Sequence, residues 1–135
     1  MKSKPDLNQI KRELSHLSKY EVVVYGSYAT NNFTIRSDID IAIITKKYNE
    51  KQNIGIWKKA LRKTMPPYQI KIFELLPLHI KGMIIDEFIV VFGDRLEISE
   101  YFYHYRKLWE DIKHRYYSNQ FVHFREKIKK MTVDL

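Results

Sequence analysis

The order of hydrophobic and polar residues along the chain predicts four helical segments and four strands. Strands are predicted for short runs rich in β-branched residues, at 21–25, 38–44, 68–75 and 89–92. Helices are predicted where apolar residues recur at helical spacing, over 7–17, 49–65, 78–88 and 95–135. In this order of elements, the first two strands follow one another directly, whereas the later strands are connected through helices. This order favours an α+β fold, with a mixed β-sheet of about four strands flanked by helices and a C-terminal helical extension.

Apolar stripes indicate which helix faces are buried. In segment 49–65 the predicted buried stripe is Ile54, Trp57 and Leu61, and Pro66-Pro67 ends the helix. In segment 95–135 the first apolar face consists of Ile98, Tyr101, Phe102, Tyr105, Leu108, Trp109 and Ile112. These aromatic residues are therefore expected in the core rather than stacked on nucleic-acid bases.

The end of the chain carries a second, weaker apolar stripe. A helix break is predicted near Ser118-Asn119, and the stripe after it consists of Phe121, Phe124, Ile128 and Met131. Too little chain remains to cover both faces of such a helix. Packing on a partner, self-association through the C-terminal helices, and folding back on the domain all remain open at this stage.

Composition narrows the class of protein. The chain has 135 residues, 44% of them hydrophobic, and no cysteine. These values fit one folded domain over 1–135 and exclude disulfides, thiolate zinc sites and a cysteine nucleophile. No apolar run approaches the roughly 18 residues that span a bilayer, and no secretory signal begins the chain. We therefore expect a cytoplasmic protein with no membrane partner.

The net charge of +8 favours a polyanionic partner, either nucleic acid or a nucleotide. Much of the excess lies between Lys46 and Lys71, where eight basic residues accompany one acidic residue, Glu50. An exposed, solvated helix face explains this charge. A surface for an acidic macromolecule or a triphosphate is the alternative.

The chemistry is concentrated between residues 22 and 44. The first strand ends in Gly26-Ser27, ten residues intervene, and Asp38-Ile39-Asp40 opens the second strand. Residues two apart in a strand share a face, so Asp38 and Asp40 are expected to project together. Paired carboxylates repel one another unless a cation lies between them, and Mg²⁺ prefers such oxygen ligands. A glycine that admits a ligand closely, beside a carboxylate pair, indicates metal-assisted phosphoryl or nucleotidyl transfer.

This spacing resembles the GS-x10-D-x-D motif of the minimal nucleotidyltransferases, small relatives of the DNA polymerase β superfamily. The resemblance covers residues 20–92 and leaves the C-terminal helices, 95–135, outside the core. It implies ATP or another NTP as substrate and two Mg²⁺ (or Mn²⁺) ions. Gly26 and Ser27 would hold the triphosphate, and Asp38 and Asp40 would bind the metal ions. In such families a third carboxylate, on a later strand, helps to deprotonate the acceptor hydroxyl.

The sequence departs from that family pattern at the third carboxylate. Gln69 falls where relatives commonly have Asp or Glu, and Glu74 lies five residues further along. A glutamine can ligate a metal ion through its amide oxygen, but it cannot act as a general base. Glu74 has the strand parity of Ile70 and Ile72, so it would reach the site only if the strand bends.

Two smaller departures lie in the first motif. Relatives place Arg directly after Gly-Ser and Gly three positions later, where this chain has Tyr28 and Asn31. Asn tolerates left-handed backbone well, so the second change is mild. Arg36 is the candidate to replace the missing phosphate contact, with an ordinary exposed loop cation as the alternative.

The resemblance extends to antitoxins of HEPN-toxin pairs, which implies transfer of AMP to a hydroxyl of a partner toxin protein. A second hypothesis, favoured by Gln69, is a catalytically impaired nucleotidyltransferase fold that acts as a binding module. A third is a nucleic-acid-binding protein that uses the basic residues Lys58, Lys59, Arg62 and Lys63.

Overall fold

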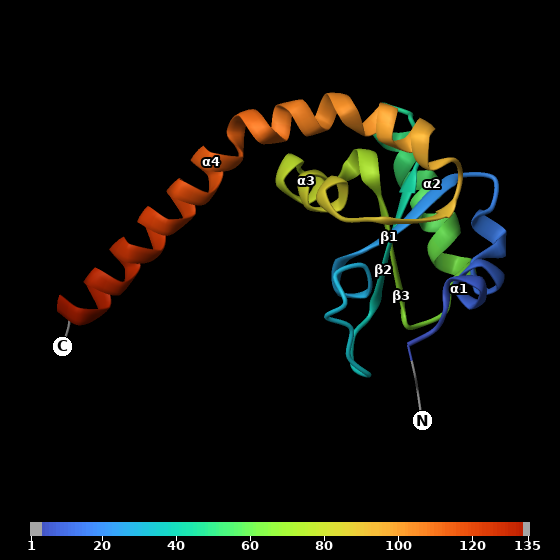
Figure 1. Cartoon of the computed structure of the whole chain (residues 1–135), viewed down its shortest axis with the longest axis horizontal. Helices are drawn as coiled ribbons and strands as arrows, with labels where there is room; N and C mark the ends of the chain where they lie inside the picture. The colour runs from blue at the N-terminus through green and yellow to red at the C-terminus, as the bar shows by residue number, and fades with distance from the viewer. Residues whose placement is uncertain (1–3, 134–135) are drawn as a thin grey trace.

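The fold is built on a mixed four-stranded sheet with helices packed against it (Figure 1). The strand order is β3-β2-β1-β4. A computed structural model describes residues 4–133, with side chains described for 4–130. The strands are β1 (Glu21–Tyr25), β2 (Ile39–Ile44), β3 (Tyr68–Ile72) and β4 (Ile89–Phe92). Strand β1 pairs antiparallel with β2 and β4, whereas β2 and β3 are parallel and are joined through a helix. The predicted mixed α+β sheet is therefore confirmed.

Helices cover both faces of the sheet. They are α1 (Leu7–Glu13), α2 (Glu50–Lys63), α3 (Leu78–Asp86) and α4 (Arg95–Val133). Three short 3₁₀ turns, η1 (Ser15–Leu17), η2 (Gly26–Tyr28) and η3 (Phe73–Leu75), complete the architecture. Side-chain oxygens of Asp6 and Asn49 accept hydrogen bonds from the first-turn N–H groups of Gln9 and Gln52, which fixes the starts of α1 and α2.

Alternation along β2 separates the two cores. Ile39, Ile41 and Ile43 face α1 and α2, in a cluster that includes Ile10, Leu14 and Ala60. Ala42 and Ile44 face α3 and α4, among Phe73, Ile84 and Phe102. Because side chains alternate with a period of two, the residues at 38 and 40 belong to the second face. Strand β2 is thus buried on both faces, and its N-terminal end is the place where polar side chains can emerge.

One predicted helix face is wrong in detail. Leu61 is 44% exposed, and α2 packs on the sheet through Trp57, Ala60 and the buried Asn53. Trp57 donates its indole N–H to the carbonyl of Ile70 at 2.6 Å, so the face of α2 that carries Trp57 lies against β3. Leu108, placed in the apolar face of the last helix, is likewise 43% exposed.

The predicted break near Ser118-Asn119 is also wrong. Helix α4 runs without interruption for 39 residues, because neither glycine nor proline interrupts its hydrogen-bond ladder there. Its first half packs on α3 and the sheet through the buried Phe102 and Trp109. The helix bends midway, and its second half extends away from the domain (Figure 1). No helix within residues 4–133 is both long enough and apolar enough to cross a membrane.

Close packing of α3 on α4 depends on Gly82. A methyl group added at this buried position would overlap the indole ring of Trp109, which is itself 1% exposed. The absence of a side chain at Gly82 therefore lets the two helices approach. Gly55, by contrast, lies in α2 with open space around its Cα.

These two glycines give a matched test of the packing. Gly82→Ala is expected to lower the free energy of unfolding by about 1–3 kcal/mol, because overpacking must displace Trp109. Gly55→Ala is expected to raise it by about 0.5–1 kcal/mol, because alanine is the better helix former. Chemical denaturation of both variants measures the difference. Equal effects at the two positions would contradict the packing described for α3 and α4.

Candidate active site

A pair of carboxylates lies at the start of β2. Asp38 immediately precedes the strand, and Asp40 is its second residue, opposite Tyr25 of β1 and Gln69 of β3 in the sheet register. The Gln69 side-chain amide donates a hydrogen bond to Oδ2 of Asp38 at 2.7 Å. Asp38 is exposed and Asp40 is half-buried. The sheet thus brings Asp38, Asp40 and Gln69 together on one face.

The pair is electrostatically unfavourable in the protein alone. Burial, together with the neighbouring charge of Asp38, raises the pKa of Asp40, and Lys71 offsets only part of this rise. Burial and the charge of Asp40 also raise the pKa of Tyr25 to about 12, so this phenol stays protonated. A raised carboxyl pKa means that ionised Asp40 costs folding stability at neutral pH, and that stability is regained as the pH falls through the raised value.

Gly26 adjoins Asp40 directly. Its φ of +70° is a left-handed backbone conformation, and a Cβ at this position would collide with Oδ2 of Asp40. Two features therefore favour glycine here, namely the turn from β1 into η2 and the space occupied by the carboxylate. The first motif and the second, ten residues apart in sequence, meet at this contact.

The loop after Gly26 folds back on itself. The N–H groups of Ala29 and Thr30 both donate to the carbonyl of Gly26, and that of Asn32 donates to the carbonyl of Ser27 at 2.9 Å. Ser27 lies in the η2 turn and is partly exposed. Asn31 has a φ of 62°, the left-handed conformation for which Asn is a good substitute for Gly.

Tyr28 is directed into the core rather than toward a ligand. It is 6% exposed, its hydroxyl donates to the carbonyl of Pro5 at 2.7 Å, and its ring makes an edge contact with Phe33. Position 28 therefore supplies packing in this chain. Arg36 lies in an exposed turn closed by the hydrogen bond from Ser37 N–H to the carbonyl of Thr34.

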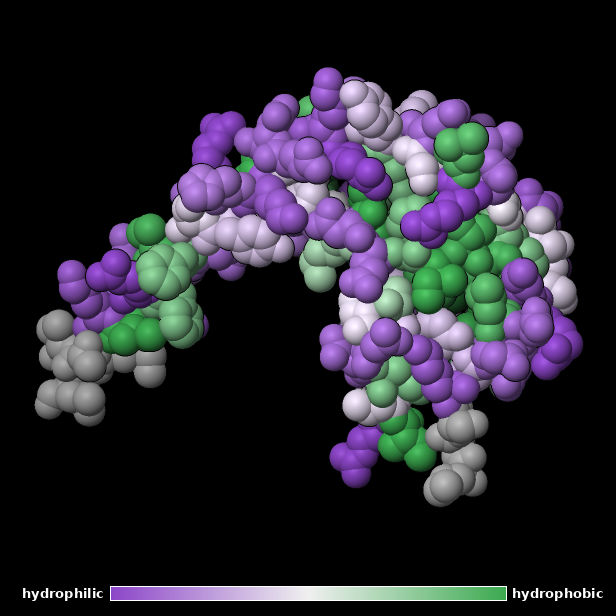
Figure 2. Space-filling view, in the orientation of Figure 1, coloured by the Kyte–Doolittle hydropathy of each residue, from purple (hydrophilic) through white to green (hydrophobic). Residues whose placement is uncertain are grey.

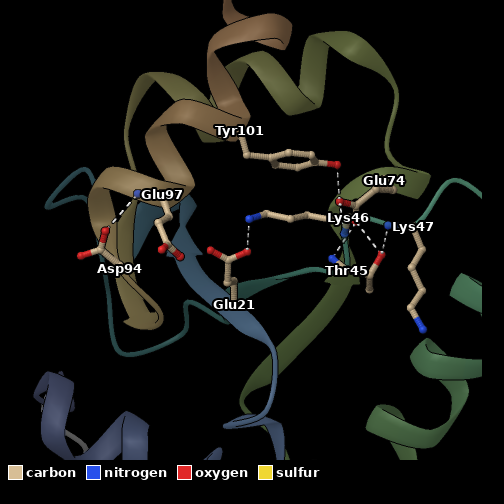
Figure 3. A network of polar contacts seen from close by, with 8 residues as sticks. All are labelled: Glu21, Thr45, Lys46, Lys47, Glu74, Asp94, Glu97 and Tyr101. Carbon is tan, nitrogen blue, oxygen red and sulfur yellow. Dashed lines mark hydrogen bonds and ion pairs between the residues drawn. The ribbon is translucent and has the colours of Figure 1, made fainter.

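Glu74 lies at the opposite end of β2 (Figure 3). Strand β3 ends at Ile72, and Glu74 is in the η3 turn, where its carboxylate accepts from the backbone N–H groups of Thr45 and Lys46 at 3.1 and 3.0 Å. The hydroxyl of Tyr101 in α4 donates to the same carboxylate at 2.7 Å. Thr45 lies five positions beyond Asp40 along the extended chain, roughly 17 Å away. Glu74 therefore fastens α4 to the sheet and is not beside Asp38 and Asp40, whereas Gln69 is.

The donor set fits a divalent cation. Asp38 and Asp40 supply carboxylate oxygens, and Gln69 can supply an amide oxygen. In the described part of the chain no lysine or arginine forms an ion pair with either aspartate, and no cluster of three or more His, Cys, Asp or Glu side chains offers another metal site. A cation between the two carboxylates would oppose both causes that raise the pKa of Asp40, its burial first and the charge of Asp38 second.

Two other surfaces lie elsewhere. A cavity of about 410 Å³ opens on the α1 and α2 side of the sheet, the face opposite to that of Asp40. Its lining includes Ser37 and Ile39, the two chain neighbours of Asp38. The exposed basic residues of α2 also belong to that layer. Tyr25 is the neighbour of the site that the sequence analysis missed, because its proximity to Asp40 depends on the antiparallel register of β1 and β2.

The repulsion between the carboxylates can be tested by its effect on stability. Asp38→Asn removes one charge and keeps an oxygen that can accept from Gln69. Without divalent ions, we expect the variant to be more stable than the wild type by about 0.5 kcal/mol, or about 2 °C in Tm. Millimolar Mg²⁺ or Mn²⁺ is expected to raise the Tm of the wild type and not that of the variant. An equal rise in Tm of the variant and the wild type on adding the ion would contradict a cation site at this pair.

Comparison with known proteins identifies the family of the chain. The sequence matches the nucleotidyltransferase domain family over residues 7–135. It is 47% identical over 109 residues to the Putative protein adenylyltransferase MJ1547 of Methanocaldococcus jannaschii, covering 81% of this chain and 84% of that protein.

Solved structures resemble the chain in fold at low sequence identity. A chain of a toxin–antitoxin complex with AMP-PNP superposes with a TM-score of 0.56 at 14% identity, covering 86% of this chain and 99% of that one. A complex of tri-AMPylated Shewanella oneidensis HEPN toxin with MNT antitoxin gives a TM-score of 0.54 at 11% identity, covering 83% and 90%. The predicted nucleotidyltransferase fold is thereby confirmed. The chain belongs to the nucleotidyltransferase domain family.

Proposed function

We propose that the protein transfers AMP from ATP to a tyrosine hydroxyl of a partner protein. The observation that carries the proposal is the contact of Gly26 with Asp40, which joins the glycine turn to the carboxylate pair. A phosphate chain lying along the turn would thereby reach the oxygens that hold a metal ion. The 47% identical relative, named as a protein adenylyltransferase, supports adenylyl transfer as the reaction.

In this proposal Asp38 and Asp40 hold Mg²⁺, with the amide oxygen of Gln69 as a further ligand. When bound, Mg²⁺ neutralises phosphate charge and polarises the α-phosphate toward attack. Gly26 leaves room for the triphosphate, and Ser27 contributes its hydroxyl. Arg36, in the exposed turn that precedes Asp38, is the proposed additional phosphate contact. Such chemistry needs cellular ATP, which is consistent with a cytoplasmic protein.

The proposed reaction is a direct displacement at the α-phosphorus of ATP. The acceptor oxygen forms a bond to this phosphorus while the bond to the bridging oxygen of the β-phosphate breaks, and pyrophosphate leaves with the electron pair. The proton of the acceptor hydroxyl passes to solvent. Gln69 cannot accept that proton, so an acidic hydroxyl is favoured as the acceptor. A tyrosine phenol, with a pKa of about 10, is the most acidic hydroxyl among protein side chains.

The proposed partner is a HEPN-type toxin. Support comes from the fold neighbours, which include a complex of an AMPylated HEPN toxin with an MNT antitoxin. Their similarity to this chain, at 11% to 14% identity, is one of fold, and the assignment of the partner is the proposal. A specific feature favours the binding-module alternative, namely the neutral Gln69 where relatives have a carboxylate.

The direct test is transfer of label from α-labelled ATP to a candidate toxin in the presence of Mg²⁺ or Mn²⁺. We expect the wild type to label the toxin on tyrosine, and a variant carrying both Asp38→Asn and Asp40→Asn to lose at least about 100-fold of this activity. Mass spectrometry of the product identifies the modified side chain. Glu74→Gln removes a carboxylate distant from the site and is the matched control, expected to retain transfer.

Three outcomes separate the alternatives. Identical signals from the wild type and the Asp38, Asp40 double variant would overturn the enzyme proposal. Tight association of both proteins with the toxin and no labelling by either would favour the binding module instead. Oligonucleotide binding that falls steeply with salt, and is lost when the basic residues of α2 are neutralised, would favour the nucleic-acid hypothesis.

A further inference from the structure

The second half of α4 stands apart from the domain. We call residues 113–130 the distal segment. At its start the ammonium group of Lys113 pairs with Asp86 of α3 at 3.2 Å, and Tyr116 stacks on His79. From there the helix extends away from the sheet, and a deep hollow separates its end from the domain (Figure 2).

Four apolar side chains form a narrow seam along the distal segment. Tyr117, Phe121, Phe124 and Ile128 recur at alternating spacings of four and three residues, which is the spacing of a helix that packs along a second helix. Phe121 and Phe124 are each 61% exposed, and Tyr117 and Ile128 are 52% and 46% exposed. Large apolar side chains exposed in one continuous row indicate an interaction surface.

Basic residues flank the seam. At about 100° per residue, Arg125 and Lys127 lie on its two sides. The guanidinium of Arg125 lies 5.8 Å from the ring centre of Phe121, which places its charge at the edge of the seam. The distal segment contains six lysines and arginines and one acidic residue, Glu126. Its charge is therefore strongly unbalanced.

We infer that the distal segment binds an acidic amphipathic helix of a partner protein. Such a helix would cover the seam with its own apolar stripe and place carboxylates beside Arg125 and Lys127. Complementary charges at these flanking positions select the partner of a helix pair. This inference requires no catalysis, and it stands or falls independently of the proposed transfer reaction.

A second copy of the chain is a poorer match. Its distal segment offers no carboxylate at the positions that flank the seam, and antiparallel pairing would place Arg125 and Lys127 against their own counterparts. Like charges facing each other across such a pair are unfavourable. The charge pattern therefore favours a partner of different sequence over self-association.

A lipid surface or a nucleic acid is also a poorer match. Helices that lie in a membrane interface present a broad apolar face, whereas this seam is one row of side chains wide. The exposed Val122 lies outside the row, roughly 130° around the helix from its centre. Nucleic-acid surfaces carry basic residues along the contacting face itself, and here apolar side chains occupy the centre with the charges beside them. A partner helix with its own apolar stripe and acidic residues beside that stripe fits both the apolar seam and its basic flanks.

The test uses the full chain and a labelled helical peptide with leucine along its seam and glutamate at the flanking positions. A matched peptide has lysine at those flanks. Fluorescence anisotropy is expected to show binding of the glutamate peptide at least about tenfold tighter than that of the lysine peptide. Combined Phe121→Ala and Phe124→Ala substitutions are expected to weaken binding at least about tenfold. Combined Arg125→Glu and Lys127→Glu substitutions are expected to reverse the preference between the peptides.

The controls keep the inference separate from catalysis and folding. The Asp38→Asn, Asp40→Asn double variant is expected to bind the glutamate peptide like the wild type, and circular dichroism checks that every variant keeps its helix content. Equal affinity for both peptides would overturn the inference. So would micromolar self-association in sedimentation, or tighter binding to phosphatidylserine vesicles or to an oligonucleotide than to the glutamate peptide.

Discussion

The repulsion between Asp38 and Asp40 is the constraint on which the account of this protein depends. Two carboxylates are fixed at one end of β2, one exposed and one half-buried, and burial together with the neighbouring charge raises the pKa of Asp40. A fold gains nothing from such an arrangement by itself, because a buried ionised group needs a partner. Charged groups that lower the stability of the fold are typical of functional sites. Here a bound cation would supply the positive charge that no ion pair within residues 4–130 gives the two aspartates.

The rest of the fold holds this pair in place. Strand β2 lies between β1 and β3 and is covered by helices on both faces, so Asp40 cannot move without disturbing the sheet. Gly26 closes against it from β1, and Gln69 reaches Asp38 from β3. At the far end of the same strand, Glu74 joins Thr45 and Lys46 to Tyr101 (Figure 3). One strand thus carries the proposed cation site at its start and the anchor of α4 at its end.

The sequence was sufficient to predict what depends on local pattern. Runs of β-branched residues located the four strands. The alternation of side chains along a strand placed Asp38 and Asp40 on one face. Asn31 was expected to tolerate left-handed backbone, and its φ of 62° agrees. What failed depends on contacts between distant segments. Leu61 is exposed because Trp57 turns the helix toward Ile70, and Glu74 was left open as a ligand until η3 placed it beside Thr45. The uninterrupted helix through Ser118 shows that two weak helix formers, Ser118 and Asn119, are not enough to end α4.

The most direct measurement is diffraction from crystals of the protein grown with Mn²⁺ and a non-hydrolysable ATP analogue. We expect an anomalous peak between the carboxylates of Asp38 and Asp40, with the triphosphate beside Gly26 and Ser27. An anomalous peak elsewhere, or a nucleotide bound on the basic face of α2 with no ion at the aspartates, would contradict it.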